Sequence, residues 1–346
     1  MLPTTTRIPY LNDQSNFTNS NLPLSESDQK KFQTLKSLPK FNSHCHLGGE
    51  IPIKTLMKYA NKEQMEVLKN AMLEIASGQD YEKAFSIFPL INQIINTHEK
   101  LKKAVYHTCQ QFKSDNNQRV LMRTGLKSLE NKDYEDSLKT VLEEIQKASA
   151  ENFSVLLMLS LKRSSSLEMA KHTIDLALKY REQGVIGIDI SDISTIGDIS
   201  IVMEELIRAK ENGLKIAVHM GESKEEKDQM LIINKLQPDF IDHGVNLCKE
   251  AENWVKEQKI PVTVCPTSAI AVKMHNPTTI HPWIINHRDS KHPIHLGTDD
   301  STVFGKSLTD EFFKLCNHLE FEKVIQIANK SFKRSEKLFR TKISII

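Results

Sequence analysis

Short apolar runs alternate with amphipathic stretches along most of the chain. The runs lie at residues 40–45, 119–123, 153–161, 185–190, 214–218, 239–242, 261–264 and 293–296. Between them, apolar residues recur at helical spacing, as over residues 134–150, 167–182, 199–212, 225–236 and 248–258. Strands that alternate with helices predict a parallel sheet. Eight such pairs predict an α/β fold of the (β/α)8 TIM-barrel class.

The segments outside this rhythm predict additions to the barrel. Residues 52–113 are too long for one strand–helix unit, so we expect a helical insertion after strand 1 that covers one end of the barrel. Residues 308–340 predict one or two C-terminal closing helices, and residues 25–38 a helix capped by Ser25 or Ser27. The chain shows no linker or repeat, so we expect a loose N-terminal arm (1–24) and one domain (25–346). A doubly wound open sheet is the alternative, but no glycine fingerprint follows the first strand.

The composition narrows the class of partner. The 46 Lys and Arg residues nearly balance the 44 Asp and Glu residues, and the resulting net charge of +2 gives no reason to expect nucleic acid or membrane. Five cysteines without a CxxC pair argue against a disulfide framework. No signal-peptide pattern or apolar span of membrane length occurs. We therefore expect a cytoplasmic protein, a monomer or weak homo-oligomer, that acts on a small molecule.

Imidazole and carboxylate groups follow four of the predicted strands. The first strand ends with His44 and His46, the fifth with His219 and Glu222, the sixth with His243, and the eighth with Asp299 and Asp300. In TIM barrels the active site lies at the C-terminal ends of the strands. These side chains are therefore expected to meet at one mouth of the barrel.

The same positions predict a metal site. His44 and His46 are two residues apart on a strand, so both point to the same face. His219 and Asp299 come from other strands around the same axis. Three imidazoles and one carboxylate suit Zn²⁺, with Fe²⁺, Co²⁺ or Mn²⁺ also possible. A single HxH pair is weak, since a buried histidine more often has a structural role. Four strand ends that agree make the metal prediction much stronger.

Six motifs resemble the adenosine deaminase family of metal-dependent amidohydrolases. They are PKFNSHCHLGG, VIGIDIS, HMGES, DHGVNL, CPTSAIAV and LGTDDSTVFG, and the resemblance runs from about residue 39 to the C-terminus. It implies the same barrel. Some other amidohydrolases bind two metals through a lysine after strand four; the sequence IDISD has no lysine, so one metal per chain is expected.

The resemblance also implies roles for individual residues. His44, His46, His219 and Asp299 look like the metal ligands, and Asp300 looks like a hydrogen-bond partner of the substrate ring. Glu222 looks like the acid that protonates a purine ring nitrogen, and His243 like the group that orients and deprotonates the attacking water. Gly221, between His219 and Glu222, would let the chain turn so that both face the pocket.

Three positions depart from the family pattern. Gly48 stands where the family usually has an aspartate that holds the ribose 5′-hydroxyl, which leaves space for a 5′ substituent or for a substrate without ribose. Asp192 stands where a glycine usually meets the purine. It would accept a hydrogen bond from an extra amino group, or it is a helix cap or loop residue. Ser301 replaces a common proline.

The expected reaction is hydrolytic deamination of a 6-aminopurine nucleoside, with release of ammonia and the 6-oxopurine. Adenosine or deoxyadenosine is the first choice of substrate. A 5′-modified adenosine, an adenine nucleotide and a nucleotide with a methylated amino group are the other candidate forms. Alternatives are deamination of free adenine, guanine or a pterin, a non-deaminating metal hydrolase, and a catalytically silent binding protein. Glu222 argues against amide or ester cleavage, because an acid aimed at a ring nitrogen has no clear duty there. The complete ligand set argues against a silent protein.

Overall fold

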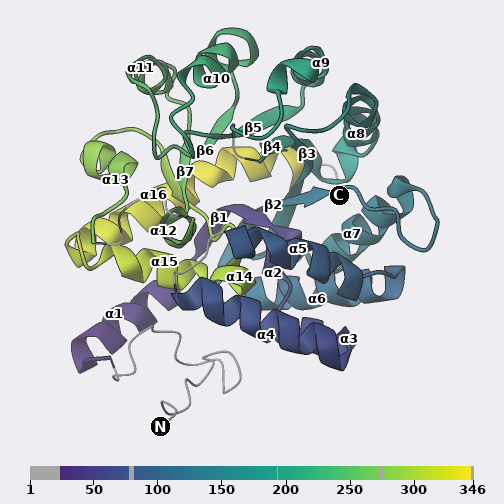
Figure 1. Ribbon diagram of the computed structural model, residues 1–346. Helices are drawn as coiled ribbons and strands as arrows, with labels where there is room; N and C mark the ends of the chain where they lie inside the picture. The colour runs from purple at the N-terminus through teal and green to yellow at the C-terminus, as the bar shows by residue number, and fades with distance from the viewer. Residues whose placement is uncertain are drawn as a thin grey trace.

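Eight parallel strands form the centre of the protein in the computed structural model, which describes residues 24–77, 82–192, 194–272, 274, 276 and 278–343 (Figure 1). The strands are β1 (Lys40–His46), β2 (Asn117–Gly125), β3 (Ser154–Lys162), β4 (Val185–Ser191), β5 (Lys215–Met220), β6 (Phe240–His243), β7 (Val262–Val264) and β8 (Ile294–Leu296). They pair in sequence order, each parallel to the next. The predicted TIM barrel is therefore confirmed, and each predicted strand lies within two residues of its observed ends.

The seam between β1 and the chain after β8 brings the two ends of the sheet together. The backbone N–H of His46 donates to the carbonyl of Asp299 over 2.8 Å, and the N–H of Asp299 donates to the carbonyl of His44 over 3.0 Å. The backbone bonds of the seam thus come from three of the residues predicted to bind metal.

Helices surround the barrel and cover one of its ends. After β1 come α2 (Leu47–Glu50), α3 (Ile53–Tyr59), α4 (Lys62–Ser77), α5 (Glu82–Ile94) and α6 (His98–Ser114). The remaining helices along the barrel are α7 (Tyr134–Ala148), α8 (Leu167–Lys179), α9 (Met203–Glu211), α10 (Glu226–Leu231), α11 (Lys249–Gln258), α12 (Pro266–Ala271), α13 (Pro282–His287) and α14 (Ser301–Phe304). Two short 3₁₀ helices, η1 (Arg181–Gln183) and η2 (Ile199–Ile201), and a π-helix, η3 (Ile232–Leu236), lie among them. The predicted insertion after strand 1 is confirmed, and its helices α4 and α5 pack side by side (Figure 1).

The N-terminal end of the barrel is filled with apolar side chains. They come from five strands and from α16 (Phe321–Ile343), and are Phe41, Leu121, Leu156, Met158, Ile186, Ala217 and Phe339. Phe339 packs edge-on to Phe41 at 5.9 Å between ring centroids. The helices α15 (Leu308–Leu315) and α16 confirm the expected closing elements. Because apolar side chains fill this end of the barrel, we expect the active site at the C-terminal ends of the strands.

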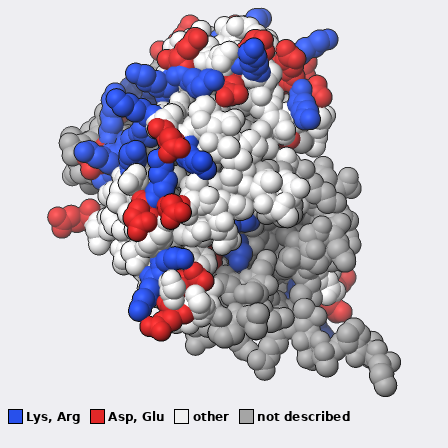
Figure 2. Space-filling view, turned by 90° about the vertical axis from the view of Figure 1, so that its left-hand side faces the viewer, with Lys and Arg blue, Asp and Glu red and all other residues white. Residues whose placement is uncertain are grey.

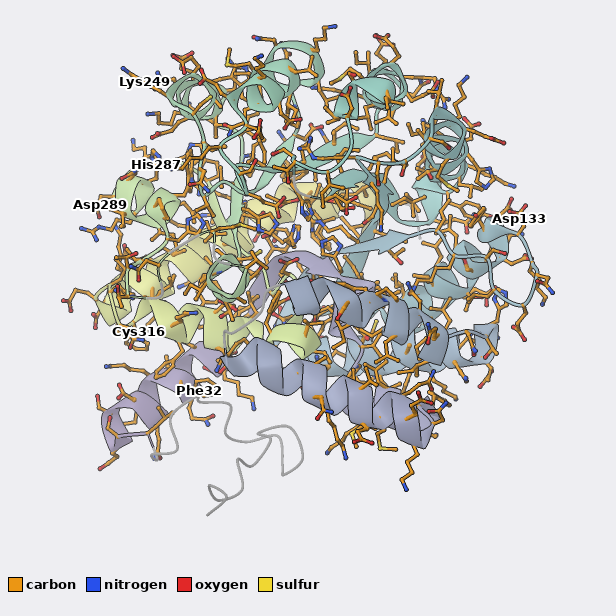
Figure 3. All side chains as sticks on the ribbon, viewed as in Figure 1. Phe32, Asp133, Lys249, His287, Asp289 and Cys316 are labelled. Atoms are coloured by element: carbon orange, nitrogen blue, oxygen red, sulfur yellow. The ribbon has the colours of Figure 1, made fainter. Side chains whose placement is uncertain are left out.

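The N-terminal helix α1 (Glu26–Ser37) begins where the sequence predicted. Ser25 caps it by accepting a hydrogen bond from the backbone N–H of Asp28 over 3.1 Å. The helix packs on α15 through an edge-on contact of Phe32, labelled in Figure 3, and Phe313. Of the predicted loose arm (1–24), all but Leu24 lies outside the described residues.

The surface carries mixed charge. On the face shown in Figure 2, Lys and Arg side chains lie among Asp and Glu side chains, in keeping with the small net charge. Among the described helices, none is both long enough and apolar enough to cross a membrane.

Candidate active site

Two imidazoles and one carboxylate converge at the end of β1. The Nε2 atoms of His44 and His46 lie 3.1 Å apart, and Asp299 Oδ1 lies 3.3 Å from the first and 3.5 Å from the second. Two nitrogen ligands on a tetrahedral zinc ion, each bound at about 2.0–2.1 Å, are about 3.3 Å apart. The three separations therefore match the edges of a tetrahedral zinc site.

His219 adds the third imidazole from β5. Its ring centroid lies 4.8 Å from that of His44 and 5.3 Å from that of His46. Its Nε2 is buried, makes no hydrogen bond to a described residue and lies 3.4 Å from Asp189 Oδ1. A buried ring nitrogen without a hydrogen bond is costly unless a cation or water satisfies it. The nitrogen-rich donor set fits a zinc ion held by His44, His46, His219 and Asp299.

A buried ion pair orients His44 from behind. Asp242 Oδ2 lies 3.0 Å from His44 Nδ1 and accepts a hydrogen bond from Arg123 Nη2 over 2.9 Å. This contact directs Nδ1–H toward the carboxylate and leaves Nε2 free for a metal. Burial opposes ionisation of Asp242, but Arg123 and His44 outweigh it and hold its pKa well below the usual range.

Asp189 on β4 supports the site from another side. Its Oδ1 lies 3.4 Å from His219 Nε2, and its Oδ2 accepts a hydrogen bond from Ser160 over 2.9 Å. Together with His46 and His219 it also forms a compact set of potential ligands. Sequence reasoning missed Asp189, Asp242 and Arg123. The sequence did show one charged residue inside each of three strands that were expected to be buried. Because charged residues are buried in a barrel interior only when they are paired, these three could have been predicted to interact.

Glu222 and His243 form a second pair beside the imidazoles. His243 Nε2 lies 3.6 Å from Glu222 Oε1 and 3.2 Å from His219 Nδ1. Gly221 has a φ of 79°, so a glycine is needed for the turn that carries Glu222 back toward His219. Burial opposes ionisation of Glu222, but His243 and His219 outweigh it and lower its pKa. Burial lowers the pKa of His243.

Asp299 and Asp300 sit in an unusual stretch of backbone. Asp299 has a φ of 60°, a left-handed conformation that non-glycine residues seldom adopt. Its Oδ2 accepts a hydrogen bond from Ser268 over 2.5 Å. Asp300 Oδ1 is buried without a hydrogen bond to any described residue. Burial, followed by the charges of Asp299 and Glu50, raises the pKa of Asp300 well above its usual range.

Two predicted substrate-binding positions, Gly48 and Asp192, make no hydrogen bond or ion pair with the described histidines of the cluster. Among the described residues, the nearest neighbour of a methyl group at Gly48 would be Phe88 Cδ1 at 3.9 Å, an ordinary contact, so a small side chain fits at this position. The carboxylate of Asp192 accepts a hydrogen bond from Ser164 over 3.4 Å, and its carbonyl accepts one from Arg163 over 3.1 Å. These contacts tie Asp192 to the loop after β3, and its role toward a substrate stays a prediction. Cys265 is buried, and burial raises the pKa of its thiol, as expected for a structural cysteine.

Nearly the whole chain matches one family. The model of the adenosine deaminase family matches residues 39–345, which span the barrel from the start of β1 to the end of α16. The chain belongs to the adenosine deaminase family. The resemblance seen in the motifs is thereby confirmed, and as a member of this family the protein is a hydrolytic deaminase.

Individual family members share the fold and about a quarter of the residues. N6-methyl-AMP deaminase-L of Xenopus laevis is 30% identical over 296 residues, covering 81% of this chain and 83% of its own. An adenosine deaminase of Clostridium botulinum is 27% identical over 288 residues, covering 80% and 87%. The crystal structure of Arabidopsis ADAL complexed with IMP has a TM-score of 0.79 at 25% identity, covering 90% and 96%. The family members thus include both nucleoside and nucleotide enzymes.

Proposed function

We propose that the protein is a zinc-dependent deaminase that converts the 6-amino group of an adenine nucleotide, with or without an N6-methyl group, into an oxo group. The observation that carries the reaction is the convergence of His44, His46 and Asp299 within 3.5 Å beside the Glu222–His243 pair. A zinc ion bound there would supply Lewis acidity, which lowers the pKa of water toward neutrality.

His243 and Glu222 can carry out all the proton transfers that this reaction requires. His243 takes a proton from water as its oxygen adds to C6, and Glu222 gives a proton to the adjacent ring nitrogen. The added hydroxyl then returns a proton to Glu222, and His243 passes its proton to the leaving amine as the C6–N bond breaks. A substrate that displaces water from Glu222 raises the pKa of this carboxyl, which is the direction that an acid requires.

Room at Gly48 supports a substrate with a 5′ substituent. The family aspartate at this position would bring a negative charge toward the ribose 5′ end, where it would repel a phosphate. Here the position has no side chain, and the nearest atom of a described residue to an added methyl would be Phe88 Cδ1, 3.9 Å away. Similarity to the Xenopus N6-methyl-AMP deaminase-L and to the IMP complex of Arabidopsis ADAL supports the same choice.

Lys127 offers a positive charge on the same rim of the barrel. It follows β2, the neighbour of β1, and makes no hydrogen bond or ion pair with a described residue. Loss of hydration lowers the pKa of Lys127 to about 8, so its ammonium group is still charged at neutral pH. An ammonium group on this rim without a partner among the described residues suits a phosphate group.

Adenosine or deoxyadenosine is the second candidate substrate. The 27% identity to the Clostridium adenosine deaminase supports it, and the absence of a carboxylate at position 48 speaks against it. Free cysteines at all five positions support the expected cytoplasmic location, where such substrates occur.

Release of amine from a substrate panel tests the proposal. The panel contains AMP, N6-methyl-AMP, adenosine, deoxyadenosine, a 5′-thio-substituted adenosine, adenine, guanine and a pterin. Ammonia is measured for each, or methylamine for the methylated member, with Glu222→Gln as the control. We expect the highest kcat/KM for a nucleotide and its loss in the control. Amine release from none of the eight, with zinc confirmed in the protein, would refute the proposal.

A further inference from the structure

Glu50 holds both ends of the segment that carries Asp299 and Asp300. Its Oε1 accepts hydrogen bonds from Thr298 Oγ1 over 2.5 Å and from the backbone N–H of Ser301 over 3.1 Å. Its Oε2 accepts a third bond from Ser301 Oγ over 2.5 Å. The side chain is 1% exposed. One buried carboxylate therefore bonds to the residue before the two aspartates and to the residue after them.

These bonds need a residue other than proline at position 301. Proline has neither a backbone N–H nor a hydroxyl, so it would remove two of the three donors to Glu50. The hydrogen bonds of Glu50 therefore depend on having Ser301 in place of the proline that is common at this position. A buried carboxylate requires hydrogen-bond donors, and Ser301 provides two of them.

The rest of the network fixes Glu50 itself. Thr298 Oγ1 accepts a hydrogen bond from Asn42 Nδ2 over 2.8 Å, and Ser301 Oγ accepts one from Gln111 Nε2 over 3.2 Å. The network therefore runs from β1 through α2 and the loop after β8 to α6. All hydrogen-bond donors in this network are uncharged, and Glu50 is the acidic group to which they lead.

The held segment is strained, so it requires such support. Asp299 adopts a φ of 60°, and conformations of this kind persist only where the surroundings over-determine them. Because Asp299 is a proposed metal ligand and Asp300 a proposed partner of the substrate ring, a small displacement of this segment would affect both metal affinity and catalysis.

We propose that Glu50 is a positioning residue, which acts through Thr298 and Ser301 to fix Asp299 and Asp300, and that it takes over the role of the proline that Ser301 replaces. The proposal rests on the proposed function for its catalytic readout. Its metal readout is independent of the substrate.

Glu50→Ala, with Glu50→Gln as its matched control, provides the first test. Glutamine keeps the shape, accepts from Thr298 and Ser301 N–H, and donates to Ser301 Oγ. For Glu50→Ala we expect zinc affinity, measured by chelator competition, and kcat at saturating zinc each to fall by about 10–100-fold, the usual effect of losing an outer contact of a metal site. KM is expected to change less. For Glu50→Gln both losses should stay below about fivefold.

Replacements at Ser301 test whether Glu50 acts through this residue. Ser301→Pro alone should impair the enzyme as much as Glu50→Ala, and Ser301→Ala, which keeps the N–H, should impair it less. Proline is favoured at the first position of a helix, where Ser301 begins α14. The double variant Glu50→Ala/Ser301→Pro is therefore expected to be less impaired than the product of the two single losses.

Several results would overturn the proposal. These are a zinc-loaded Glu50→Ala enzyme within twofold of the original in both readouts, equal damage in Glu50→Gln and Glu50→Ala, or strictly multiplicative losses in the double variant. If Glu50→Ala does not fold, the comparison of Ser301→Ala with Ser301→Pro decides, and equal effects of the two refute it. Amine release by the unmodified enzyme tests the proposed function separately.

Discussion

Gly49 lies directly against the carboxylate of Asp300. A methyl group at position 49 would come within 1.8 Å of Asp300 Oδ1 and 2.4 Å of its Cβ, which is far inside any allowed contact. At the neighbouring Gly48, an added methyl group would make only an ordinary contact with the described residues, to Phe88 Cδ1 at 3.9 Å. The two consecutive glycines therefore differ: the Asp300 side chain excludes any larger residue at position 49, whereas a small side chain fits at position 48.

Gly49→Ala is expected to displace Asp300. A misplacement of about 1 Å near reacting groups lowers rates by roughly 100-fold, so a fall in kcat of that size is expected. Gly48→Ala is the matched comparison and should cause a much smaller loss in kcat. The measurement is steady-state kinetics on the best panel substrate at saturating zinc. Similar losses in both variants would contradict the distinction between the two glycines.

Gly48→Asp is expected to change the preference for the 5′ group. The restored carboxylate can bond to a 5′-hydroxyl and repels a 5′-phosphate, so the ratio of kcat/KM for adenosine to that for AMP should rise by at least 10-fold. Gly48→Asn, which adds a similar side chain without charge, separates repulsion from loss of space. If the ratio stays constant in Gly48→Asp, position 48 does not face the 5′ end.

Lys127 should make nucleotide turnover depend on pH above neutrality. Its pKa is lowered to about 8, so the ammonium is present below that pH and is lost as the pH rises through it. We expect KM for AMP to increase between pH 7 and pH 9, while KM for adenosine stays flat. Lys127→Met should raise KM for AMP and remove its pH dependence. An unchanged KM in this variant would exclude a phosphate contact.

Ser268→Ala tests the second contact of Asp299. The hydroxyl donates to Asp299 Oδ2 over 2.5 Å, opposite the oxygen that faces His44 and His46. Its loss should weaken zinc binding about 10-fold, because partners of a ligand orient it and tune its basicity. Ser290→Ala, in an exposed turn, is the control. Equal zinc affinity in both variants would show that Asp299 needs no such partner.

The barrel and the cluster of polar groups were predictable because both follow strong periodicities. The strand–helix rhythm predicted all eight strands. The histidines of strands 1, 5 and 6 and Asp299 after strand 8 do converge, since Asp299 and the rings of His219 and His243 all lie beside His44. For these residues, position on a strand determines direction, and strand direction in a barrel determines location.

The supporting residues were not predictable, because their partners are distant in sequence. Glu50 reads as an ordinary helix residue until Thr298 and Ser301, about 250 positions away, are brought beside it. Arg123 reads as a strand end until Asp242 is seen to pair with it. Asp192 illustrates the opposite case, since its carboxylate bonds to Ser164 rather than to the imidazole cluster. Periodicity carries no information on such pairings.

A metal ion bound beside Asp299 would also stabilise the closure of the barrel. Asp299 uses its backbone to join His44 and His46 and its side chain to face the same two residues, so an ion bound there would hold β1 to the chain after β8. We expect amide hydrogens of His46 and Asp299 to exchange more slowly with zinc than after chelation, and more so than those across β2 and β3. Loss of the ion would then accompany local opening of the sheet between β1 and Asp299. The rate at which the enzyme loses activity would therefore follow the rate at which this part of the sheet opens.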